Sequence, residues 1–397
     1  MSTVRKVRTA IVGCGMISNI YIRNLKNLFY ITDLVALCDH KQETAAQKAR
    51  EYGIEKVMTL EEIAASEDIE LVVNLTGPAA HYDVIRMMLD SGKHIYTEKM
   101  MAVTLEQGQE LVALANEKHL YLGVAPDTVL GAGIQTARKI MDAGLIGNIT
   151  SCYASINRNQ SLNSETFRFL RNNGGALPYD VGIYYIAALL CLLGPVRSVR
   201  GFGAPAPLYT PQLLYKLSEI PVTPWQIPGN NLMIGALEFE SGVLGGLHFD
   251  GNTIGESQHA LQMFGTEGIL ELGDPNTFNG YVKLIRPEAE PCLLPLTHGY
   301  NGDPVLPNPT SWEYAYGHRG IGVAEMAWAI RQNRPCRCSK EYGLHAMEVL
   351  CGLDEAAANG NTFYPKSRFA INPLPSGYFS SLGHGQLRGD AETSLMN

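Results

Sequence analysis

The sequence feature that most constrains the fold is an apolar run, Thr9 to Val12, that leads directly into a Gly-x-Gly-x-x-Ser pattern from Gly13 to Ser18. Apolar residues then recur at roughly helical spacing, so the stretch predicts a strand, a glycine turn and a helix. In such a turn Gly13 permits a conformation that a Cβ would obstruct, and Gly15 lets the backbone come close to a pyrophosphate. The helix directs its free N–H groups at the phosphates. Because the same pattern also occurs in turns that bind nothing, a second signal is needed.

A carboxylate supplies that second signal. Asp39 ends another apolar run, which begins at Leu34, and it lies roughly 20 residues beyond the glycine turn, where a dinucleotide-binding unit places its ribose-binding acid. A carboxylate accepts hydrogen bonds from both ribose hydroxyls and repels a 2′-phosphate, so NAD is favoured over NADP. His40 and Lys41 follow directly and could offset part of that repulsion. The alternative is that Asp39 is an ordinary turn residue after a strand.

Length and charge restrict the kind of protein. At 397 residues the chain is long enough for two domains, and its net charge of −8 argues against nucleic acid or a membrane surface as a partner. The charged start leads into a strand, so we expect no signal peptide, and no window approaches the length of a membrane span. The eight cysteines are scattered without a Cys-x-x-Cys pattern, so we expect reduced thiols, a cytoplasmic protein and no bound metal.

Strands and helices alternate from the glycine turn to Pro126. Apolar runs predict strands at 69–75, 94–97 and 120–124, and helical patterns separate them. Capping boxes at Thr59 and Thr104 mark two helix starts, and Gly53 ends a third helix, 44–52. This alternation predicts a parallel sheet with right-handed crossovers.

After residue 126 the pattern changes. Helices are expected at 133–143, 179–193, 320–332 and 340–359, and short strand-like runs with glycine-rich turns fill most of 149–286. This predicts a second, α+β domain with an open, predominantly antiparallel sheet. We therefore expect a Rossmann-type NAD-binding domain over 1–126, a substrate-binding and oligomerisation domain over 127–374 and a tail over 375–397. The long loops 204–231 and 294–316 are expected to be lids or subunit contacts.

Two short patterns carry candidate chemistry. Glu98-Lys99 follows the predicted strand 94–97, at the edge where a parallel sheet binds its ligands, so the lysine can reach the nicotinamide end of a dinucleotide. Asp180 and Tyr184 are four residues apart on the predicted helix 179–193 and should share a face. The alternative is that Lys99 is a surface residue, Tyr184 belongs to the core and Asp180 is an N-terminal helix charge.

Together these pieces resemble the glucose–fructose oxidoreductase / inositol dehydrogenase family of two-domain oxidoreductases. In this family the lysine is usually followed by proline, where this chain has Met100, and the tyrosine position more often holds histidine. Tyrosine at position 184 is similar to the glucose–fructose oxidoreductase branch. The matching segments lie between about Val7 and Gly360 and are the Gly13–Ser18 turn, Asn74-Leu75-Thr76-Gly77-Pro78 leading to His81, Glu98-Lys99, Asp180-x-Gly182-x-Tyr184 and Gly265-Thr266-Glu267-Gly268.

The resemblance implies an NAD-dependent oxidoreductase that oxidises a secondary hydroxyl of a sugar, glycoside or polyol between two domains. The residue types support this, because a lysine ammonium lowers the pKa of a nearby tyrosine from its ordinary value of about 10. Tyr184 would take the hydroxyl proton, Lys99 would polarise it or the substrate oxygen, and Asp180 would orient a sugar hydroxyl. The residues expected to bind the cofactor are Gly13, Gly15, Met16, Ile17, Asp39, Asn74, Thr76, Pro78, His81, Glu98 and Lys99.

Further candidates and alternatives remain open. Asn157, Arg158 and His318 are expected to bind substrate hydroxyls beside Lys99, Asp180 and Tyr184, although each is as readily an ordinary structural residue. A narrower hypothesis is oxidation at C3 of a glycoside, with a tightly bound nucleotide recycled by a second carbonyl compound. One alternative is a redox-assisted glycosidase. Another is a non-catalytic dinucleotide-sensing regulator, and the presence of Lys99 and Tyr184 argues against the regulator. An open sheet must bury its apolar face, so we expect a dimer or larger homo-oligomer.

Overall fold

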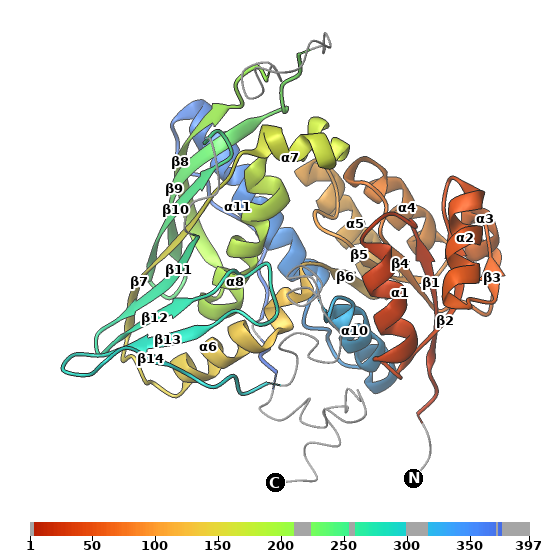
Figure 1. Cartoon of the computed structure of the whole chain (residues 1–397), viewed down its shortest axis with the longest axis horizontal. Helices are drawn as coiled ribbons and strands as arrows, with labels where there is room; N and C mark the ends of the chain where they lie inside the picture. The colour runs from red at the N-terminus through yellow and green to blue at the C-terminus, as the bar shows by residue number, and fades with distance from the viewer. Residues whose placement is uncertain (1–3, 210–223, 254–258, 299–316, 371, 375–397) are drawn as a thin grey trace.

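Two sheets stand side by side in the computed structural model, with helices packed between and around them (Figure 1). The structure describes residues 4–209, 224–253, 259–298, 317–370 and 372–374. The predicted tail, 375–397, lies outside the described residues, as do 210–223 and 299–316 of the two long predicted loops.

The first sheet has six strands in the order β3-β2-β1-β4-β5-β6, and all of its neighbours run parallel. The apolar runs of the sequence form its strands, and β1, β4 and β5 are almost completely buried because helices cover both faces. The predicted parallel sheet is confirmed. Its elements are β1 (Val7–Val12), α1 (Ser18–Asn27), β2 (Thr32–Cys38), α2 (Gln42–Tyr52), β3 (Lys56–Val57), α3 (Leu60–Ala65), β4 (Leu71–Asn74), α4 (Pro78–Asp90), β5 (His94–Thr97), α5 (Leu105–Glu117) and β6 (Leu122–Val124).

The helix ends mostly follow the sequence signals. Gly53 closes α2 in the left-handed conformation. The Thr59 capping box is complete, because the Thr59 hydroxyl accepts from the Glu62 N–H and the Glu62 carboxylate accepts from the Thr59 N–H. The second predicted capping box is only half formed. The Thr104 hydroxyl accepts from the Gln107 N–H, whereas Gln107 Oε1 has no partner.

The second sheet has eight strands in the order β14-β13-β12-β11-β7-β10-β9-β8. Only β7 and β10 pair in parallel, and the other neighbouring pairs are antiparallel. The predicted open, mostly antiparallel sheet is therefore confirmed. Its strands are β7 (Ile149–Asn157), β8 (Val196–Pro205), β9 (Asn230–Phe239), β10 (Leu244–Asp250), β11 (Ala260–Gly265), β12 (Ile269–Leu272), β13 (Val282–Ile285) and β14 (Cys292–Leu293).

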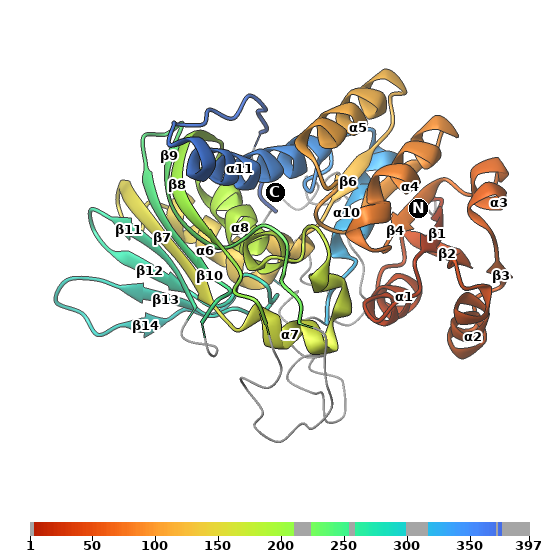
Figure 2. The same cartoon turned by 90° about the horizontal axis from the view of Figure 1, so that it is seen from above.

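Helices cover one face of the second sheet, the face that looks toward the first sheet (Figures 1 and 2). The helices on this side are α6 (Ala132–Asp142), α8 (Ile183–Leu193) and α11 (Lys340–Asn359), and α8 is buried over almost its whole length. A helix buried on all sides must be apolar all round, which explains its sequence. None of the described helices lies against the opposite face of the sheet.

After the second sheet the chain returns to the first. The helix α10 (Ile321–Gln332) packs near β5 and β6, and the N–H of Val124 in β6 donates to Cys338 O at 2.9 Å. The buried amide of Asn24 donates to the carbonyl oxygens of Gly317 and Arg319, each at 2.7 Å. Packing therefore crosses position 126, and the sequence-based domain division stays a prediction.

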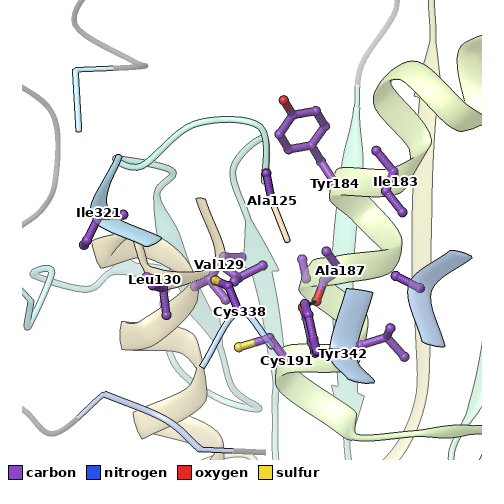
Figure 3. Close-up of a cluster of buried hydrophobic side chains, with 14 of the residues drawn as sticks. Ala125, Val129, Leu130, Ile183, Tyr184, Ala187, Cys191, Ile321, Cys338 and Tyr342 are labelled. Atoms are coloured by element: carbon purple, nitrogen blue, oxygen red, sulfur yellow. Dashed lines mark hydrogen bonds between the residues drawn. The ribbon is translucent and has the colours of Figure 1, made fainter. Parts of the chain in front are cut away.

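The hydrophobic core is continuous across the two sheets. One buried cluster contains Ile11 and Tyr96 of the first sheet together with Leu189 of α8 and Phe249 of the second sheet. Figure 3 shows the part of it where α8 meets the segment after β6, with Ala187 and Cys191 near Val129. Of the helices in the described ranges, none combines the length and apolarity that crossing a membrane requires.

Candidate active site

The glycine turn has the geometry that its sequence predicts. Gly13 adopts a φ of +98°, and a Cβ on it would lie 2.6 Å from the carbonyl carbon of Leu75. A Cβ on Gly15 would meet nothing within 4 Å, so the backbone faces open space there. The buried Ser18 hydroxyl donates to Gly15 O at 2.6 Å where α1 begins. Met16, 61% exposed, and the half-buried Ile17 complete the turn.

Asp39 lies beside this turn at the carboxyl end of β2. One carboxylate oxygen accepts from the Cys14 N–H at 2.8 Å, and the other accepts from the Lys41 N–H at 2.9 Å and lies 3.0 Å from a ring nitrogen of His40. Each oxygen has two lone pairs, so Asp39 can hold the turn and still accept from a ribose. Asp39 can therefore be both a structural residue of the turn and a ligand of the ribose hydroxyls.

The loop after β4 forms the next part of the cradle. The buried Asn74 accepts from the N–H and hydroxyl of Thr76 at 3.2 and 2.7 Å, and Pro78 occupies the first turn of α4. His81 is also buried, and its two ring nitrogens lie 2.9 Å from Thr76 O and 2.6 Å from Met100 O. Burial lowers the pKa of His81. His81 thus connects the loop after β4 to the loop after β5. These hydrogen bonds of Asn74 and His81 are made to Thr76 and Met100 of the protein itself.

These residues fit a dinucleotide. The open space at Gly15 accommodates close approach of a phosphate, α1 and α4 begin beside it, and Asp39 supplies ribose acceptors. Within the described residues no group of three or more His, Cys, Asp or Glu side chains is placed to hold a metal ion.

Lys99 joins this cradle to the second domain. It follows β5, and its Nζ donates to Asp180 Oδ1 at 3.1 Å and to the backbone oxygen of Asp180 at 2.7 Å. The same ammonium lies 5.2 Å from the centre of the Tyr184 ring. Burial alone would lower the pKa of Lys99, but the charges of Tyr184, Asp180 and Glu98 raise it above the ordinary value. The peptide bond between Lys99 and Met100 is cis.

Asp180 is held by three side chains. Besides Lys99, Arg158 donates to Asp180 Oδ2 at 2.6 Å and Gln160 donates to the same oxygen at 3.1 Å. Burial opposes ionisation of this carboxyl, yet Lys99, Arg158 and Gln160 together hold its pKa below the usual range. Asp180 is therefore a fixed carboxylate and not a mobile helix charge.

The start of the α8 region differs from the expected single helix. Pro178–Gly182 forms a π-helical turn, and the α-helix begins only at Ile183. The expectation of one regular helix over 179–193 is therefore wrong at its first turn, whereas Asp180 and Tyr184 both contact Lys99, as residues that share a face would. Figure 3 shows the Tyr184 ring pointing away from the buried cluster around Cys191.

The pKa of Tyr184 moves opposite to the expected direction. Its side chain is only 6% exposed, and burial raises the pKa above the ordinary value even though Arg319 and Lys99 act to lower it. The expectation that Lys99 alone depresses this pKa is wrong, because the loss of hydration outweighs the field of the lysine.

Arg319 is a residue of the cluster that sequence reasoning missed. Its guanidinium donates to the Tyr184 hydroxyl oxygen at 3.0 Å and lies 3.5 Å from the buried Asp127 carboxylate. The neighbouring His318, the expected candidate, packs edge-on against Phe278 with ring centres 6.1 Å apart. The only sequence signal was the position of Arg319 directly before the predicted helix 320–332.

The remaining predicted residues lie next to this cluster. Glu98 accepts from the hydroxyl of Tyr21 at 2.8 Å and from the Lys99 N–H at 3.2 Å. Asn157 ends β7 one residue before Arg158 and accepts from the Ser155 hydroxyl at 3.5 Å. The contacts described thus bring together Lys99, Arg158, Asp180 and Tyr184, whereas Asn157 and His318 are sequence neighbours of cluster members.

A parallel sheet with this glycine turn, followed by an open sheet that supplies a buried polar cluster, defines a two-domain dinucleotide-binding protein. The chain matches the family model described as the oxidoreductase family with an NAD-binding Rossmann fold over residues 7–125, and the GFO/IDH/MocA C-terminal domain over residues 134–271. It therefore belongs to the GFO/IDH/MocA oxidoreductase family, as the sequence resemblance indicated.

Relatives in other organisms are similar at modest identity. An uncharacterized oxidoreductase of Schizosaccharomyces pombe is 30% identical over 199 residues, 49% of this chain and 53% of that protein. An NAD⁺-dependent scyllo-inositol 2-dehydrogenase of Bacillus subtilis is 24% identical over 275 residues, 68% of this chain and 74% of that protein. The chain spans about half the length of several curated relatives that it matches.

A solved structure shows the same fold. Levoglucosan dehydrogenase in complex with NADH superposes with a TM-score of 0.75 and 18% sequence identity, covering 91% of this chain and 100% of that chain.

The two glycines of the turn predict separable effects. Gly15→Ala should weaken nucleotide binding by about tenfold or more, because the methyl group fills the space that a phosphate approaches, and should leave the melting temperature near native. Gly13→Ala should also reduce the free energy of unfolding by about 1 kcal/mol or more, because of its positive φ. NADH fluorescence titration and thermal unfolding of both variants check this. Equal loss of stability in the two variants would contradict it.

Proposed function

We propose that this protein is an NAD-dependent dehydrogenase that oxidises a secondary hydroxyl group of a sugar, glycoside or polyol. The observation that carries this proposal is the contact of Lys99 with both Asp180 and the Tyr184 ring, at the edge of the parallel sheet where the nucleotide cradle lies. It places an ammonium, a carboxylate and a phenol together beside the cradle. These are groups that an alcohol substrate needs for binding and proton removal.

The proposed cofactor-binding residues are those of the cradle. NAD, when bound, supplies the acceptor for the hydride that leaves the oxidised carbon. Asn74 and His81 support the cradle indirectly, because their hydrogen bonds hold the loops after β4 and β5 in place. The residues proposed to contact the nucleotide are Gly13, Gly15, Met16, Ile17, Asp39, Thr76, Pro78, Glu98 and Lys99.

The proposed proton acceptor is Tyr184. In its phenolate form Tyr184 accepts the proton as the substrate O–H bond breaks, a hydride leaves the carbon that bears the oxygen, and the C–O bond becomes a carbonyl. Lys99, an ammonium already held by Asp180, polarises the substrate oxygen. A carboxylate offers about four acceptor sites, and Lys99, Arg158 and Gln160 occupy three on Asp180. One site is left for a sugar hydroxyl, so Asp180 orients the substrate.

Two narrower variants and two alternative functions are distinguished by simple measurements. Oxidation at C3 of a glycoside predicts a ketoglycoside product, and a recycled, tightly bound nucleotide predicts that it survives purification. A redox-assisted glycosidase would release the aglycone without net change in the nucleotide. A dinucleotide-sensing regulator would bind nucleotide and oxidise nothing. The paired Lys99 and Tyr184 support the dehydrogenase over the regulator.

One experiment tests the proposal directly. The purified protein is examined by absorbance and mass spectrometry for a carried nucleotide, and then assayed at the reduced-nicotinamide absorbance band with NAD⁺ and a panel of sugars, glycosides and polyols. Appearance of reduced nicotinamide with at least one polyhydroxy compound is the expected result. Binding of NAD without oxidation, hydride exchange or hydrolysis of any panel member would contradict it.

We also propose that the protein is a cytoplasmic homo-oligomer. All eight cysteines are unpaired, which suits a reducing compartment. The sheet face opposite α8 and α11 carries exposed apolar side chains at neighbouring strand positions: Phe202 of β8 is 82% exposed, and its register partner Ile234 of β9 is 48% exposed. Such a patch favours burial against a second copy.

Asp39 should determine the preference for NAD over NADP. Asp39→Asn keeps a side-chain oxygen for the turn but removes the negative charge that repels a 2′-phosphate. The ratio of NADP to NAD dissociation constants should therefore fall by about tenfold or more. Isothermal titration with both nucleotides measures this, with Asp33→Asn on the same strand as a control. Equal affinity of the native protein for the two nucleotides would defeat the prediction.

Tyr184→Phe should leave nucleotide binding intact while turnover falls by roughly 10²–10⁴-fold, the range for loss of a general base. Tyr185→Phe is the matched control, because it removes the hydroxyl of the next buried tyrosine, which faces Asp274 at 3.4 Å. Steady-state rates on the substrate found in the panel provide the measurement. Near-native turnover of Tyr184→Phe would place the base elsewhere, with His318 as the next candidate.

The assembly should depend on the exposed sheet face. Replacing both Phe202→Glu and Ile234→Lys should convert the native oligomer to a monomer, because charges cannot be buried in an apolar contact without a large penalty. Tyr30→Glu, an exposed aromatic residue of the first domain, should leave the assembly unchanged. Light scattering at micromolar concentration measures the molar mass of the native protein and of each variant. A native protein that is monomeric would refute the proposal.

A further inference from the structure

The Tyr184 hydroxyl oxygen has a cationic partner that comes from a distant part of the chain. Arg319, 2% exposed, lies directly before α10, and its Nη2 donates to the Tyr184 oxygen at 3.0 Å and to Asn276 Oδ1 at 3.1 Å. Its own carbonyl oxygen accepts from the buried Asn24 amide at 2.7 Å. The arginine is therefore fixed at both its backbone and its guanidinium.

We infer that Arg319 is the positioning residue that holds the Tyr184 oxygen toward the substrate and stabilises its phenolate form. This rests on the proposed role of Tyr184 as proton acceptor. A guanidinium has donors and no acceptor, so the tyrosine oxygen must accept in this contact and its own proton points elsewhere. When that proton is absent, the contact becomes a charge-assisted hydrogen bond, which is stronger than the neutral one.

Lys99 is less well placed for this role. Both cations lie 5.2 Å from the centre of the Tyr184 ring. The hydrogen bonds differ, because Arg319 donates to the Tyr184 oxygen and Lys99 donates to two oxygens of Asp180. The charge of Lys99 is thus shared with a carboxylate at 3.1 Å. The two cations therefore have different roles. Lys99 binds Asp180 and polarises the substrate oxygen, and Arg319 donates a hydrogen bond to the Tyr184 oxygen.

Asp127 anchors the guanidinium from the opposite side. Its Oδ2 accepts from the N–H groups of Gly320 and Gly322 at 2.8 and 3.2 Å, and its Oδ1 lies 3.5 Å from Arg319 Nη1. Burial raises the pKa of Asp127 to about 6, with Arg319 and the two N–H groups acting to lower it. At neutral pH and above, the carboxylate is charged and pairs with the arginine.

The charged groups that face Tyr184 have opposing effects. Arg319 and Lys99 favour the phenolate, and Glu98 and Asp180 oppose it, against a background of burial that raises the pKa. A cation within about 4–6 Å lowers the pKa of an acid by about 1–3 units. Removing Arg319 should therefore raise the pKa of residue 184 by about that amount.

The experiment reads this pKa without requiring turnover. A difluorinated tyrosine in place of Tyr184 has a lower intrinsic pKa, so its ionisation can be followed by fluorine NMR under mild conditions. Arg319→Met should raise the measured pKa by about 1–3 units, and Arg319→Lys should restore at least half of the shift. Lys99→Met should produce a smaller shift than Arg319→Met. In turnover, the rising limb of the kcat–pH profile should move upward with Arg319→Met.

Two controls separate this role from a structural one. Arg337→Met removes another buried arginine, which pairs with Glu325 at 2.8 Å, and should reduce stability without moving the titration. If Arg319→Met does not fold, the double replacement Arg319→Met and Asp127→Asn removes both charges together and takes its place. An unchanged titration in the Arg319 variant, or a larger shift in Lys99→Met, overturns the inference. A native protein that oxidises no sugar defeats the proposed function, while the titration still decides the role of Arg319.

Discussion

The candidate site depends on the contact between Lys99 and Asp180. Lys99 follows a strand of the first sheet, Asp180 lies in the turn that begins α8, and the ammonium donates to two oxygens of Asp180. Both side chains are largely buried. A buried ion that loses its partner while it stays out of water costs several kcal/mol, so the buried Lys99 needs the Asp180 carboxylate. Asp180 is held in addition by Arg158 and Gln160, and the pair joins the nucleotide cradle to the second domain.

Opposite charges alternate through the site. Arg158 and Lys99 flank Asp180, and Arg319 lies between Asp127 and the Tyr184 oxygen. Each buried charge in this series has an opposite charge or a hydrogen-bonding partner beside it, as a low-dielectric interior requires. The two arginines present several donors in fixed directions, whereas the lysine supplies a compact charge.

Sequence reasoning located residues of the candidate site where local backbone geometry restricts the residue type. Gly13, Asp39 and Lys99 lie at the glycine turn and the strand ends as expected, and their roles stay predictions. Sequence reasoning failed for Arg319, which contacts Tyr184 across 135 residues of chain. No periodicity or spacing connects two such positions, so only the folded structure brings them together. The π-helical turn at Pro178–Gly182 was missed for a different reason, because a single-turn change in helix type leaves the apolar pattern almost unaltered.

Burial explains why the lowered pKa that the sequence predicted for Tyr184 is wrong. Asp180 and Tyr184 are both buried near Lys99, yet the pKa of Asp180 is lowered and that of Tyr184 is raised. The carboxylate receives hydrogen bonds from three side chains, and these contacts outweigh its loss of hydration. The phenol oxygen of Tyr184 receives a hydrogen bond from Arg319, and this contact does not outweigh the loss of hydration. The ionisation state of a buried acid therefore depends on the number of donors that reach its oxygen, and proximity to one cation is not enough.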